Sequence, residues 1–183
     1  MIKNFFKHLH TVNRHRWEVF KLCVKVGIPL RGLLHDLSKY SYTEFSESVK
    51  YFADGKYSPL KRCKEINGYS KAWIHHFGRN KHHYEYWYDS AAPKPKPVIP
   101  FKYMLEMICD RVAASKVYRK KDYSSAYPLE YFYKEKPKMV LNDSLMNFLE
   151  EVFTELSIKG EVILNKKHLK ELYLKYIKNE TYY

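Results

Sequence analysis

The chain has 183 residues, of which 45% are hydrophobic and 29% charged, and it contains only six glycines. These values exclude an intrinsically disordered chain and predict one compact, mainly helical domain over residues 1–183. The opening MIKNFFKHLH is too polar for a signal peptide, and no apolar run approaches the roughly 18 residues of a membrane span, so we expect a soluble, cytoplasmic protein without membrane contact.

The net charge of +13 favours anionic partners such as nucleotides, nucleic acids or acidic proteins. Much of the lysine excess is interleaved with tyrosine, however, which is equally typical of a solvated surface. The three cysteines Cys23, Cys63 and Cys109 form no C-x-x-C pair, so we interpret them as reduced core residues.

The N-terminal half reads as a series of helices. Apolar residues at three- and four-residue steps predict a helix over residues 2–26, and a shorter one follows at about 30–38. Ser41 and Glu44 fit a capping box that opens a helix to about Phe52, ended by Asp54 and Gly55. Residues 59–77 are again helical in pattern, with a break at Gly78.

The C-terminal half begins with APKPKPVIP, residues 92–100, which we expect to be an extended connector because proline lacks the amide donor of a helix. A helix is predicted over 101–120, irregular structure over 123–140, and two amphipathic helices over 144–159 and 166–178. No segment reads as a strand. The sequence therefore predicts an all-α fold.

Four of the nine histidines lie in the stretch IHHFGRNKHHYEYW: His75, His76, His82 and His83. Adjacent residues on a helix point about 100° apart, so we expect one histidine of each pair to share a site and the other to be spare. Imidazoles are common ligands of Zn, Fe, Mn and Ni.

Further polar residues lie among apolar neighbours: His15 on the first helix, His35 and Asp36 on the second, and Asp110 on the helix 101–120. Burying such groups costs several kcal/mol unless they are paired or bind a cation. Each has a structural explanation: a hydrogen-bonded core histidine, a helix cap, or an arginine or lysine partner for Asp110. One metal site with ligands from all these segments would compensate every group.

The order H…HD…H…H(H)…D of these residues resembles that of the HD-domain metal-dependent phosphohydrolases, an all-helical superfamily. HDLSK at 35–39 looks like the H-D-x-G-K motif with Ser38 in place of glycine, and CDRVAAS at 109–115 is similar to the superfamily's final Asp-Arg/Lys stretch. HDLSK and HHF-x-x-N-x-HHYEYW also resemble a small bacterial and phage group within it. The resemblance implies an HD-like helical bundle over about 8–120 and a helical extension over 121–183.

The residues that match the superfamily's metal ligands are His15, His35, Asp36, His76, His82 or His83, and Asp110. In two-metal members the residue at Asp36 bridges the ions, so the resemblance implies one or two divalent ions of Mn, Fe, Ni, Co or Zn. Lys39 matches a lysine that faces the substrate phosphate.

The expected function is hydrolysis of a phosphate ester, preferentially a nucleotide, by water that the metal activates. Asp36 would orient this water, and Lys39, Arg79 and Lys81 would supply positive charge for the phosphate. Two alternatives stay open: a basic module that binds nucleic acid or a protein, and a degenerate enzyme that binds a nucleotide without hydrolysing it.

Overall fold

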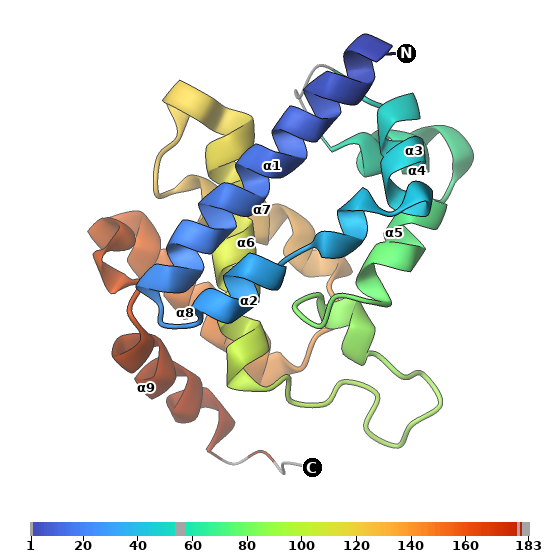
Figure 1. Ribbon diagram of the computed structural model, residues 1–183. Coiled ribbons are helices and arrows are strands. Elements are labelled where there is room, and N and C mark those ends of the chain that lie inside the picture. The colour runs from blue at the N-terminus through green and yellow to red at the C-terminus, as the bar shows by residue number, and fades with distance from the viewer. Residues whose placement is uncertain (1, 54–57, 179, 181–183) are drawn as a thin grey trace.

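The structure is a computed structural model that describes residues 2–53, 58–178 and 180, and every regular element within these ranges is helical (Figure 1). The prediction of an all-α bundle is confirmed. The helices are α1 (Ile2–Lys25), α2 (Pro29–Leu34), α3 (Tyr42–Lys50), α4 (Pro59–Asn67), α5 (Lys71–Phe77), α6 (Phe101–Arg119), α7 (Tyr127–Glu135), α8 (Asp143–Lys159) and α9 (Lys166–Ile177). Single 3-10 turns are η1 (Leu37–Tyr40), η2 (Tyr84–Trp87), η3 (Lys120–Asp122), η4 (Lys136–Lys138) and η5 (Gly160–Ile163).

Helix α6 lies at the centre of the bundle, with α1 across one side and α7 and α8 on the other (Figure 1). It is buried on several faces because its apolar residues are not confined to one stripe. The hydrophobic core joins α6 to α1, α8 and α9; its fully buried members include Val19, Ile108, Val112, Phe148, Val152 and Leu169.

Helix α1 presents one narrow stripe to this core. The buried residues along it are His8, Val12, His15, Val19 and Leu22, at alternating steps of four and three. Side chains at these steps lie on one face of a helix. His15 therefore faces α6 from within an apolar stripe.

Three predicted elements differ from the structure. The helix expected over 30–38 stops at Leu34, and the one expected over 59–77 is divided into α4 and α5 at Gly68, which has a positive φ of 80°. Residues 123–140 are not irregular, because Pro128 stands in the first turn of α7, where an amide donor is not needed.

The other predicted helices begin and end within about two residues of the observed ones, and the proline-rich connector contains no regular element. Ser41 caps α3 by accepting a hydrogen bond from the Glu44 amide, as predicted. The expected helix terminators Asp54 and Gly55 lie outside the described residues. Among the described helices, none combines the length and apolar character that crossing a membrane requires.

Candidate metal centre

The centre is organised around a break in the chain between α2 and η1. His35 leaves the helix with an extended ψ of 129°, and Asp36 takes a left-handed conformation with φ 53°. A non-glycine residue in this region costs about 1–2 kcal/mol. Arg16 of α1 holds the break in place, because its guanidinium donates hydrogen bonds of 2.8 Å to the carbonyl oxygens of His35 and Leu33.

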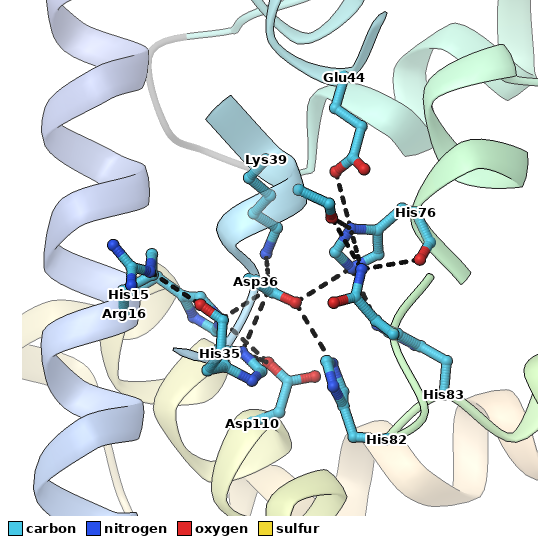
Figure 2. A network of polar contacts seen from close by, with 12 residues as sticks. His15, Arg16, His35, Asp36, Lys39, Glu44, His76, His82, His83 and Asp110 are labelled. Atoms are coloured by element: carbon cyan, nitrogen blue, oxygen red, sulfur yellow. Dashed lines mark hydrogen bonds and ion pairs between the residues drawn. The ribbon is translucent and has the colours of Figure 1, made fainter. Parts of the chain in front are cut away.

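One set of possible ligands surrounds Oδ2 of Asp36. The Nε2 atom of His35 lies 3.2 Å from this oxygen and that of His15 lies 3.8 Å from it. Oδ1 of Asp110 completes the set at 2.9 Å from His15 Nε2 and 3.6 Å from His35 Nε2. Helices α1 and α6 thus bring their polar residues to the break after α2 (Figure 2).

A second set surrounds the other oxygen of the same carboxylate. Oδ1 of Asp36 lies 3.4 Å from Nε2 of both His76 and His82, and Nε2 of His83 lies 3.0 Å from that of His76. Figure 2 shows Asp36 between the two sets, with His76 and His82 on one side and His15 and His35 on the other. Within each set, one atom from every residue lies within 4.8 Å of the others, so each set could hold a metal ion.

Several of these atoms are buried without a hydrogen bond. They are Nε2 of His15, His35 and His82 and both carboxylate oxygens of Asp36, of which Oδ2 also forms an ion pair with Lys39. A buried polar atom that makes no hydrogen bond costs about 1–3 kcal/mol. Because these nitrogen and oxygen atoms converge on one another, a bound cation would satisfy all of them. Mixed imidazole and carboxylate donors suit a transition-metal ion.

Two outer carboxylates orient the histidines. Oε1 of Glu106 lies 3.0 Å from Nδ1 of His35 and 3.3 Å from Nδ1 of His82, and its Oε2 pairs with Arg31. Oε2 of Glu44 lies 2.8 Å from Nδ1 of His76. A carboxylate on Nδ1 fixes the tautomer that leaves Nε2 free to bind a metal.

Burial and charge set the protonation of these groups. Burial opposes ionisation of Asp36, but His35, Lys39 and His76 hold its pKa well below the usual value. The pKa of Glu106 falls to about 2, since hydrogen bonds from His35 and His82 outweigh its burial.

The pKa values of the histidines shift in opposite directions. Burial lowers the pKa of His15 and that of His83. Burial also acts to lower the pKa of His35, but the neighbouring Asp36, Asp110 and Glu106 carboxylates raise it well above the usual value. A proton on His35 thus compensates the negative charge of the neighbouring carboxylates. A metal ion would compensate the same charge.

All the residues predicted as metal ligands meet in the two sets: His15, His35, Asp36, His76, His82, His83 and Asp110. One spare histidine is expected in each pair, but the structure brings both His82 and His83 into the second set. His82 and His83 do not lie on an α-helix, and the extended backbone of His83 lets both rings reach the second set. His75 is outside the sets and contacts Glu44 through Nδ1 at 2.7 Å.

The predicted substrate-binding residues differ in their distance from the centre: one contacts it and two do not. Lys39 contacts Oδ2 of Asp36, and its side chain is 26% exposed whereas that of Asp36 is 1% exposed. Arg79 and Lys81 are exposed and belong to neither ligand set.

Sequence reasoning missed Arg16, Arg31, Glu44 and Glu106. Glu106 forms a third possible ligand group with His35 and His82. Its signal was its place one turn before Asp110 on the same face of a largely apolar helix. For Glu44 the sequence pattern indicates only a capping role.

The family description that the sequence matches spans residues 4–155, which contain every residue of both ligand sets. The chain belongs to DUF5662, a family of unknown function. The match runs from α1 into α8, so the DUF5662 region includes the central helix and all segments that supply the centre. No curated protein and no solved structure matches this DUF5662 chain.

Proposed function

We propose that this protein is a metal-dependent phosphohydrolase of the HD-domain kind, which hydrolyses a phosphate ester and preferentially a nucleotide. The observation that carries the proposal is the convergence of two nitrogen and oxygen ligand sets on the two oxygens of the buried Asp36. The sequence resemblance adds support, since the same residues follow the superfamily's order of motifs.

The residues fit one or two divalent ions of Mn, Fe, Ni, Co or Zn. His15, His35 and Asp110 would hold one ion, His76, His82 and His83 the other, and Asp36 would contact both. When bound, such an ion supplies Lewis acidity that activates water and neutralises charge on phosphoryl oxygens. The ionised state of Asp36 and Asp110 and the neutral state of His15 and His83 suit this role.

The chain's own groups provide orientation and charge. The Asp36 carboxylate accepts a hydrogen bond from the attacking water and aligns it with the phosphorus atom. Lys39 would face the phosphate, since its ammonium group contacts Asp36 and its side chain is partly exposed. Arg79 and Lys81, exposed on the loop after α5, attract the anionic substrate as it approaches.

The test combines metal analysis with turnover. Untagged protein purified without chelator is analysed for bound metals, and its hydrolysis of a generic aryl phosphate and of nucleoside monophosphates is measured with Mn, Co, Ni or Fe added. We expect stoichiometric metal, and turnover that is lost in Asp36→Asn and His35→Ala but retained in His75→Ala.

The proposal is rejected if the wild-type protein binds no metal, or if turnover is the same in Asp36→Asn as in wild type. Circular dichroism of each variant separates loss of activity from loss of the fold.

A further inference from the structure

A second polar feature lies beside the centre. An open cavity of about 480 Å³ lies between the N-terminal half of α1 and the C-terminal end of α6. Its lining residues are Phe6, Lys7, His10, Thr11, Arg14, Phe52, Val117 and Lys120. Three of them are lysine or arginine, one is histidine, and none of the described lining residues is acidic. The cavity therefore favours an anion.

The cavity and the metal centre share two helices. Arg14 precedes the candidate ligand His15 on α1, and Val117 follows Asp110 by seven residues on one face of α6. Seven residues of helix correspond to about 10 Å. The cavity therefore begins about 10 Å along α6 from Asp110.

His8 lies on the buried face of α1, two turns before His15. The His8 ring packs 5.7 Å from the ring of Phe52, which lines the cavity. Burial, together with the charge of Lys39, lowers the pKa of His8 to about 4. Nδ1 of His8 is buried and has no hydrogen-bond partner. The face of α1 that carries the candidate ligand His15 thus also carries a histidine packed against the cavity wall.

Backbone strain also marks both sites. Among the described residues, Asp36 and Lys120 are the non-glycine residues with positive φ, at 53° and 54°. Such conformations cost about 1–3 kcal/mol and are concentrated at functional sites. Asp36 is at the centre and Lys120 lines the cavity. The positive φ at Lys120 therefore falls in the turn that borders the cavity.

We propose that the cavity binds a second anionic group of the substrate, about 10 Å from the phosphate that is hydrolysed. The substrate is then a phosphate ester with two separate anionic groups. Arg14 and Lys120 bind the second group, and Phe6 and Phe52 line the same cavity. This inference rests on the proposed function only in assuming that the phosphate at the metal centre is hydrolysed.

The test uses alkyl phosphonates, whose carbon–phosphorus bonds resist hydrolysis, so that binding is measured apart from turnover. Hexane bisphosphonate, with a phosphonate at each end, spans a distance similar to that between the two sites, whereas hexylphosphonate has one anionic end. Calorimetry with the purified wild-type protein is expected to show at least about tenfold tighter binding of the bisphosphonate, as two charge-assisted contacts require.

Two variants assign this advantage to the cavity. Arg14→Gln removes one charge, and Lys120→Gly removes another without strain, because glycine accepts a positive φ. Both should reduce the bisphosphonate advantage to less than about threefold. Lys170→Gln, an exposed change of the same charge on α9, should preserve it.

Equal binding of the two phosphonates to wild type overturns the inference. So does an advantage that survives in Arg14→Gln and Lys120→Gly, or one that is lost equally in Lys170→Gln. If the advantage behaves as expected but no ester is hydrolysed, the proposed function fails and the anion site stands.

Discussion

At the scale of single residues, His75 and His76 offer a comparison within one helix. Both occupy the last turn of α5 and both contact the Glu44 carboxylate through Nδ1. Only His76 directs Nε2 to Asp36. His76→Ala should therefore weaken metal binding by at least about tenfold, as loss of a ligand does, whereas His75→Ala should leave it nearly unchanged. Metal titration by calorimetry measures both.

A similar loss in the two variants would contradict this assignment, since it would mean that disturbance of Glu44 or α5 matters more than ligation. Equal retention of metal in both would remove His76 from the centre.

Glu106 allows a prediction for a residue that contacts the possible ligands from outside. Its carboxylate contacts Nδ1 of a histidine from each ligand set, His35 and His82. Glu106→Gln removes the charge but keeps the shape, so we expect about 10–100-fold weaker metal binding with the fold intact. Glu85→Gln is the matched control, because Glu85 Oε2 is 4.0 Å from His83 Nδ1 and makes no hydrogen bond. Equal losses of metal binding in the two variants would mean that Glu106 does not orient the possible ligands.

At the scale of elements, the packing of α2 on α1 sets the position of the break at Asp36. A Cβ atom on Gly32 would lie 2.6 Å from Cys23 Cβ and 3.0 Å from the Phe20 Cα. Gly32→Ala should therefore separate the two helices and lower the free energy of unfolding by about 1–3 kcal/mol, with weaker metal binding. Urea denaturation measures the change in stability.

Leu33→Ala provides the comparison on the same short helix, because Leu33 is 58% exposed. Its effect on the free energy of unfolding should stay within about 0.5 kcal/mol. If Gly32→Ala is as mild as Leu33→Ala, close packing of α2 is not what positions His35 and Asp36.

Periodicity along the chain was sufficient to predict the long helices, because α1 and α6 bury continuous sets of apolar residues. It also placed His15 and Asp110 correctly, since both are polar residues on buried faces. The break at His35 and Asp36 could not be predicted, because hydrogen bonds from Arg16, about twenty residues earlier, stabilise it. Nor does a local pattern reveal that Glu44 and Glu106 contact histidines more than twenty residues away.

At the scale of the whole molecule, the centre joins segments that are distant along the chain. Its possible ligands come from α1, the α2–η1 break, α5, the loop before η2, and α6. A bound ion therefore links elements that separate on unfolding. An ion at a hundred times its Kd stabilises the folded state by about 2.7 kcal/mol.

For a chain of this length, that free energy corresponds to a rise in Tm of about 5–10 °C. We expect thermal unfolding followed by circular dichroism to show this rise when Mn or Co is added to chelator-treated protein. Asp36→Asn should abolish it. An equal rise in Asp36→Asn would mean that the ion stabilises the protein from another place.

The most direct measurement of the central claim is anomalous X-ray diffraction from crystals of the purified protein, recorded on both sides of the absorption edge of the metal it contains. The account predicts an anomalous peak about 2.0–2.3 Å from an Asp36 carboxylate oxygen and from Nε2 of His35 or His76. The absence of a peak beside Asp36, or peaks at surface histidines such as His10 alone, would contradict it.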